Sequence, residues 1–67
     1  MHFFRLINIL KQRRKDLGIT QEDLAMLSGI GLRTIKEFES GKGNPTLKTV
    51  NTLLSVVGME IDFIVKR

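Results

Sequence analysis

The stretch that decides the fold runs from Thr20 to Leu47 and reads TQEDLAMLSGIGLRTIKEFESGKGNPTL. Its first part, residues 21–28, follows a threonine that is a favoured N-cap residue and carries apolar residues at helical spacing. Its second part, about residues 32–40, repeats that spacing. Between them, Ser-Gly-Ile-Gly at positions 28–31 predicts a short, tight turn. Two helices joined by a short turn that contains glycine form a helix-turn-helix unit, here about residues 21–40.

Small and apolar residues fall where such a unit needs them. Ala25 leaves room where the second helix of the unit approaches closely, and Gly29 lies in the turn, where a left-handed backbone changes the chain direction. Ile35 and Phe38 supply the buried side of that second helix. The residues left on its outer side are Leu32, Arg33, Lys36 and Glu37.

Two more helices flank this unit. One is predicted over about residues 3–16 and ends before Gly18; the other is predicted over about residues 47–57, behind the N-cap Thr46, and is closed by Gly58. Apolar residues at three- and four-residue steps predict the inner faces of the helices. They are Phe3, Leu6, Ile7, Leu10 and Leu17 for the first helix, Leu24, Ala25 and Leu27 for the second, and Leu47, Val50, Leu53, Leu54 and Val57 for the fourth. The sequence predicts an all-α four-helix domain over residues 1–58.

The tail changes its period from helical to alternating. Apolar Met59, Ile61, Phe63 and Val65 alternate with other residues, which predicts one β-strand within residues 59–67. Since no other segment predicts a strand, its partner must come from outside the chain. Two partners remain open: the same strand of a second subunit, antiparallel about a two-fold axis, or a different protein that adds to the strand edge.

Composition excludes several classes of function. Sixty-seven residues form one domain, and the absence of cysteine excludes disulfides and thiolate metal sites. No apolar run is long enough to cross a membrane and no signal peptide is predicted, so we expect a cytoplasmic protein. The only histidine, His2, is near the terminus, and no catalytic or metal-ligand set is present. We therefore expect neither enzyme activity nor a cofactor or metal.

The charge suits a polyanionic partner. The net charge is +4 and the pI is about 10.0. Cations cluster at residues 13–15 and again at Arg33, Lys36 and Lys42. For Arg13 and Lys15 the sequence leaves two interpretations open: a solvated helix end, where cations suit the helix dipole, or a contact with the polyanion.

The motif residues T-Q, L-A, S-G, T-I, E-x-G-K and N-P-T-L occur in this order between residues 20 and 47. Together they resemble the XRE/Cro/CI helix-turn-helix family of phage and bacterial repressors, and the resemblance covers about Leu6 to Gly58. It implies a compact lambda-repressor-like domain that binds double-stranded DNA sequence-specifically. It also implies a homodimer that reads a palindromic operator.

The same resemblance implies roles for individual residues. Phosphate contacts would come from Gln21, Thr34, Lys42, Gly43 and Asn44, and base readout from Leu32, Arg33, Lys36 and Glu37. It also pairs Arg14 with Glu39, as an ion pair that joins two helices and stays out of the DNA contacts. Leu32 departs from the glutamine or serine usual in the family; it either packs on a thymine methyl or turns away and leaves readout to Arg33 and Lys36.

The end of the chain, GMEIDFIV at residues 58–65, is similar to that of HipB-type antitoxins. This likeness implies a dimer joined by C-terminal strands, repression of the protein's own operon and a complex with a HipA-type serine/threonine kinase toxin. Two alternatives remain: a stand-alone phage- or plasmid-type repressor, or a protein-interaction module that has lost DNA binding. Arg33, Lys36 and Lys42 argue against the last, because a module without DNA has no need of cations on that face.

Overall fold

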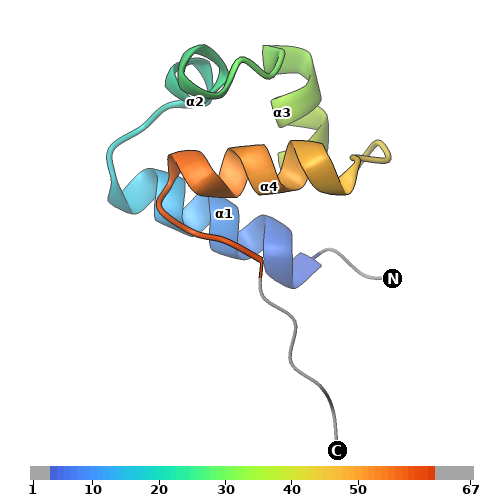
Figure 1. Cartoon of the computed structure of the whole chain (residues 1–67), viewed down its shortest axis with the longest axis horizontal. Coiled ribbons are helices and arrows are strands. Elements are labelled where there is room, and N and C mark those ends of the chain that lie inside the picture. Colours follow the sequence, from blue (N-terminus) through green and yellow to red (C-terminus); the bar gives the residue numbers. More distant parts are fainter. Residues whose placement is uncertain (1–3, 62–67) are drawn as a thin grey trace, which may run out of the picture.

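A computed structural model describes residues 4–61 of the chain (Figure 1). This part contains the helices α1 (Phe4–Asp16), α2 (Gln21–Ser28), α3 (Leu32–Glu39) and α4 (Leu47–Val56). The prediction of four helices is confirmed, and their bounds differ from the predicted ones by about one residue. The helices predicted to end at Ser40 and Val57 end one residue earlier, because these two residues are the C-caps of α3 and α4.

The helices enclose one small core. α2 packs against α3 and α4, and α1 packs against α3; Figure 1 shows α2 and α3 above, with α1 and α4 below. Burial of apolar side chains from all four segments removes them from water and supplies most of the driving force for folding. The buried apolar residues are Ile7, Leu10, Leu24, Ile35, Phe38, Val50, Leu53, Leu54 and Val57.

The helix ends follow local sequence signals. Thr20 and Asp23 form a capping box: the Asp23 N–H donates to Thr20 Oγ1 at 3.0 Å, and the Thr20 N–H donates to Asp23 Oδ2 at 3.0 Å. Thr46 caps α4 by accepting from the Thr49 N–H at 3.1 Å. Gly29 ends α2 with φ of 75°, a left-handed conformation that turns the chain towards α3. The predicted caps and turn are therefore confirmed.

The prediction of the core is wrong at three positions: Leu17, Leu27 and Leu47 are exposed. Leu17 comes after the end of α1, so it no longer follows the helical face of Leu10. Leu27 lies outside the buried side of α2, which centres on Leu24. Leu47 shares a side with Val50 but lies in the first turn of α4, at the edge of the core. Of the other predicted positions, Phe3 lies outside the described residues.

The predicted strand is not present in the part of the tail that the structure describes. Met59, Glu60 and Ile61 have irregular backbone, and Met59 and Ile61 pack against the core of their own domain. The Met59 N–H donates to the Leu54 carbonyl at 2.9 Å, which closes the C-terminal end of α4 and changes the direction of the chain. The physical reason is that these apolar side chains find an intramolecular surface without any strand partner. Phe63 and Val65 lie outside the described residues.

Arg13 joins the ends of α1 and α4. Its Nε donates to the carbonyl oxygen of Val57 at 3.0 Å, across 44 positions of sequence. This carbonyl is at the C-cap of α4, where helix geometry leaves it without a partner of its own. The contact gives Arg13 a structural role that neither of the two interpretations open from the sequence had included.

Candidate nucleic-acid interface

α3 presents one side to the core and the other to solvent. Ile35, Phe38 and Glu39 are buried, while Arg33 and Lys36 are exposed. Because α3 is held by contacts with α1 and α2, its outer side is fixed relative to the rest of the domain. A short helix with one anchored side and one exposed, charged side has the geometry that helix-turn-helix proteins insert into a major groove.

The four predicted base-reading residues do not share one setting. Leu32 is half-buried at the start of α3, which leaves both of its interpretations open. The side chain of Arg33 is 92% exposed, and its Nε donates to Glu37 Oε1 at 3.1 Å. Lys36 is exposed three residues after Arg33 and lines a hollow beside α3. The outer side of α3 therefore has an arginine–glutamate pair and a lysine that takes no part in that pair.

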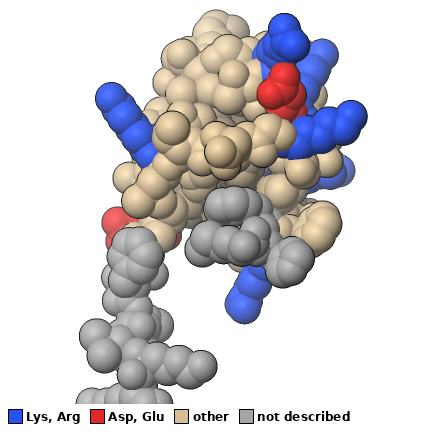
Figure 2. Space-filling view, turned by 90° about the vertical axis from the view of Figure 1, so that its right-hand side faces the viewer, with Lys and Arg blue, Asp and Glu red and all other residues tan. Residues whose placement is uncertain are grey.

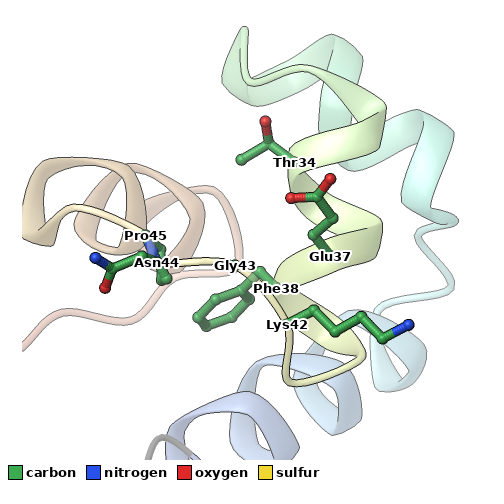
Figure 3. A pocket seen from close by; sticks show the side chains of 7 residues that line it. All are labelled: Thr34, Glu37, Phe38, Lys42, Gly43, Asn44 and Pro45. Carbon is green, nitrogen blue, oxygen red and sulfur yellow. The ribbon is translucent and has the colours of Figure 1, made fainter.

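A hollow of about 150 Å³ lies beside the C-terminal half of α3 (Figure 3). It brings together four of the five predicted phosphate contacts, Thr34, Lys42, Gly43 and Asn44, with Glu37, Phe38 and Pro45. Figure 3 shows the side chain of Lys42 extending away from the carboxylate of Glu37. The Lys42 N–H donates to the Glu37 carbonyl at 2.8 Å, so the loop is fixed to the last turn of α3. An exposed lysine beside glycine backbone suits an anionic oxygen.

A second, larger hollow of about 370 Å³ lies on the other flank of α3. It contains the fifth predicted phosphate contact, Gln21, and adds cations that the sequence had not assigned to this site. Its lining residues are Lys11, Arg14, Lys15, Gln21, Lys36, Glu39 and Ser40. Lys11 and Ser40 are the candidates that sequence reasoning missed, whereas for Lys15 a contact with the polyanion was one of the two interpretations left open. The cluster at residues 13–15 was a signal for Lys15, but only the packing of α1 against α3 brings it beside Lys36.

The floor of this second hollow is a buried ion pair. Arg14 Nε and Nη2 donate to Glu39 Oε2 and Oε1, each at 2.8 Å, and Arg14 Nη1 donates to the Ile19 carbonyl at 2.8 Å. Arg14 is 8% and Glu39 is 6% exposed. The hydrogen bond to the Glu39 side chain raises the pKa of Arg14 above its usual value, so the guanidinium stays charged. The pair joins α1 to α3, as the resemblance to the family implied.

The ion pair also holds Gln21. Gln21 Nε2 donates to Glu39 Oε1 at 3.2 Å, which fixes the side chain at the start of α2. The hydroxyl oxygen of the N-cap residue Thr20 accepts a hydrogen bond from the Asp23 N–H. The N–H groups of Gln21 and Glu22 lie in the same first turn of α2 and are not bonded by this cap. The first turn of a helix is a favourable place for an anion. Gln21 is therefore placed where a phosphate oxygen could meet both its amide and the start of α2.

Positive charge dominates the surface around α3. Figure 2 shows Lys and Arg side chains gathered along one edge of the domain, with an acidic group between them.

No group of three His, Asp or Glu side chains within residues 4–61 is placed to hold a metal ion. None of the described helices is long and apolar enough to span a bilayer.

Comparison with known proteins identifies the fold. The family model described as Helix-turn-helix matches residues 10–64. An uncharacterised HTH-type transcriptional regulator of Methanothermobacter thermautotrophicus is 35% identical over 52 residues, 78% of this chain and 75% of that protein. One of Haemophilus influenzae is 37% identical over 59 residues, 88% of this chain and 60% of the relative. The SPbeta prophage-derived regulator YonR of Bacillus subtilis is 35% identical over 57 residues, which are 85% of this chain and 53% of that protein.

The chain thus spans between about half and three-quarters of the length of these relatives. All three are named as transcriptional regulators, and the matched region contains the whole unit α2–turn–α3 that the geometry singles out. The protein therefore belongs to the XRE-type helix-turn-helix family of DNA-binding transcriptional regulators.

Proposed function

We propose that the protein is a sequence-specific repressor that places α3 in the major groove of double-stranded DNA. The observation that carries this proposal is the pair of hollows that flank α3: one is lined by Lys42, and the other by Lys11, Lys15 and Lys36. The two phosphate backbones of a duplex border its major groove on both sides. A helix with at least one lysine in the hollow on each flank matches that arrangement, because each backbone then meets its own set of donors.

Each set of residues has a distinct task in this proposal. Gln21 and the lysines at residues 11 and 15 hold one backbone, and Thr34 with the loop 42–44 holds the other. These contacts fix register and supply affinity that depends on salt, but they carry no sequence information. Base identity is read by the outer side of α3, with Arg33 as the strongest candidate because an arginine forms a two-pronged contact with guanine O6 and N7.

We further propose that the protein acts as a homodimer on a palindromic operator. One domain with a Cα radius of gyration of 11.8 Å presents a single recognition helix, which makes few base contacts. Two such helices about 34–36 Å apart would read two half-sites one helical turn apart. The support for a C-terminal interface is the alternation of apolar residues that includes Phe63 and Val65. Pairing in this proposal starts after Ile61, because Met59 and Ile61 pack on their own domain.

The resemblance of residues 58–65 to HipB-type antitoxins supports a second role. In this proposal the dimer represses its own operon and also binds a HipA-type serine/threonine kinase toxin. A kinase-like reading frame next to the gene, whose product co-purifies with this chain, is the expected finding. Its absence would leave the stand-alone phage- or plasmid-type repressor as the function.

Selection of bound sequences from a random double-stranded DNA pool at physiological salt tests the proposal. We expect enrichment of a palindrome whose half-sites lie one helical turn apart. Sedimentation of the wild type and of Phe63→Asp tests the dimer, which the variant should lose. Enrichment of a single half-site would reject the dimer and keep DNA reading. No enrichment would reject sequence-specific binding and favour a protein-interaction module.

A further inference from the structure

The recognition helix contains a carboxylate among its cations. Glu37 lies one helical turn after Arg33 and accepts a hydrogen bond from Arg33 Nε at 3.1 Å. The side chain of Arg33 is 92% exposed, and within residues 4–61 this carboxylate is the group that its guanidinium bonds. Glu37 is 45% exposed at its side chain, and it therefore has the firmer position of the two.

Glu37 is itself held by the loop that follows α3. Its carbonyl oxygen accepts from the Lys42 N–H at 2.8 Å and from Ser40 Oγ at 2.9 Å. Its Oε2 lies 3.3 Å from the point where a Cβ on residue 43 would be, and Gly43 has φ of 81°. Glycine at this position both adopts the left-handed backbone and leaves room for the carboxylate. The loop thus supports Glu37, and Glu37 in turn contacts Arg33.

The hydrogen bond to Glu37 uses only the Nε of Arg33 and leaves its two terminal nitrogens without this partner. A guanidinium has five N–H donors, of which Nε carries one and the two terminal nitrogens carry four. Because Glu37 takes the Nε donor, both terminal nitrogens remain for a two-pronged contact with guanine O6 and N7. An arginine that is already held in place loses less side-chain freedom when it binds, so its contact with guanine is stronger. Since guanine is the base that accepts from both nitrogens, a stronger contact raises the preference for guanine over the other bases.

We propose that Glu37 is a positioning residue, which fixes the guanidinium of Arg33 so that its two terminal nitrogens face a guanine. This inference rests on the proposed function, since it assigns Glu37 a task within the same DNA-reading site. Figure 3 shows the carboxylate of Glu37 pointing along α3 towards Thr34, the residue next to Arg33 in the sequence. A carboxylate that reads cytosine itself would have to point outward at a base edge instead.

The test measures base preference rather than affinity alone. The selected operator and its single-base variants are bound in competition to the wild type, Arg33→Ala, Glu37→Ala, Glu37→Gln and the double alanine variant. Arg33→Ala marks the base positions that Arg33 reads. At those positions we expect Glu37→Ala to lower the preference about threefold. Glu37→Gln should keep most of it, because its amide oxygen still accepts from Nε. Thermal melting followed by circular dichroism confirms that each variant is folded.

The double variant separates positioning from direct reading. In the Arg33→Ala background, Glu37→Ala should change the preference at no position. A loss at a different base position that persists in this background would show that Glu37 reads a base itself. Tighter binding to every sequence with an unchanged preference would show that the carboxylate only repels phosphate. Either result overturns the inference while DNA reading stands; a wild type with no preference would instead reject the proposed function, before any variant is compared.

Discussion

The two arginine–glutamate pairs of this domain use the same chemistry in opposite settings. Arg14 and Glu39 lie 25 positions apart on different helices, meet through two hydrogen bonds of 2.8 Å, and have side chains that are 10% and 3% exposed. Arg33 and Glu37 are one turn apart on α3, meet through one bond of 3.1 Å, and have side chains that are 92% and 45% exposed. The first pair also bonds the Ile19 carbonyl and the Gln21 amide, whereas the second faces solvent.

Burial decides what each pair can do. A buried charge has no water to replace a missing partner, so the first pair has one favourable arrangement and fixes the orientation of α1 and α3. An exposed pair is screened by water and salt and contributes little to stability. The guanidinium of Arg33 can therefore give up its contacts with water and bind a ligand at little cost in the stability of the fold. The buried pair belongs to the fold, and the exposed pair is available to a ligand.

The largest effect is expected where the buried pair is broken. Glu39→Ala leaves Arg14 charged and without its main partner, and we expect the free energy of unfolding to fall by about 3 kcal/mol. Urea denaturation followed by circular dichroism measures this loss. The double change Arg14→Met with Glu39→Leu should recover most of it, because two apolar side chains leave no unpaired charge. A loss below about 1 kcal/mol for Glu39→Ala would erase the contrast between the two pairs.

The exposed pair should show the reverse pattern. We expect Arg33→Ala to leave the free energy of unfolding within about 0.5 kcal/mol of the wild type. It should lower discrimination at one or two base positions per half-site by about 1–3 kcal/mol. Competition binding with single-base operator variants measures the second effect. If specificity were unchanged, α3 would not be the reading element.

The lysines beside α3 sharpen the comparison further. Lys42 and Lys15 line the two hollows, and their replacement by alanine should weaken binding to all sequences alike. For each phosphate that the variant no longer neutralises, the slope of log affinity against log salt should become shallower by about 0.9. Arg5→Ala is the matched control, because Arg5 is an exposed cation of α1 that lines neither hollow. Equal slopes for all three variants would reject the phosphate roles.

Asp23 is a carboxylate held by backbone rather than by a cation. Hydrogen bonds from the Thr20 backbone N–H and from its side chain hold the pKa of Asp23 below the usual range. A lowered folded pKa stabilises the fold at pH above the unfolded value, about 3.9, and this contribution is lost as the pH falls through the folded pKa. Urea denaturation at a series of pH values should show the advantage of the wild type over Asp23→Asn shrinking on acidification. A pH-independent difference would contradict the role of the charge.

The smallest effect concerns the stability of the exposed pair. Glu37→Ala should change the free energy of unfolding by less than about 0.5 kcal/mol, as for other pairs four residues apart on a helix. Expressed as a free energy, the effect of Glu37→Ala on base preference should exceed its effect on the free energy of unfolding. A loss comparable to that of Glu39→Ala would mean that the pair on α3 is structural as well.

Local signals explain how much of the fold could be predicted. Helix periodicity, the caps Thr20 and Thr46 and the turn glycine Gly29 act over a few residues, so they specify the four helices nearly to their ends. The same signals failed where a side chain depends on a distant neighbour. Leu47 has the right period and is exposed, and the alternation that begins at Met59 predicted a strand where Met59 and Ile61 instead pack against the core of their own domain.

The sequence by itself determined the helix-turn-helix unit, the residues on the outer side of α3 and the anchoring of its inner side by Ile35 and Phe38. Only the tertiary structure decided which cations share a surface: it brought Lys11 and Lys15 of α1 beside Lys36 of α3, and it bound Gln21 to Glu39. The physical reason is the range of the forces involved. Periodicity and capping depend on neighbours along the chain, whereas a binding surface depends on how separate helices pack, which no local pattern encodes.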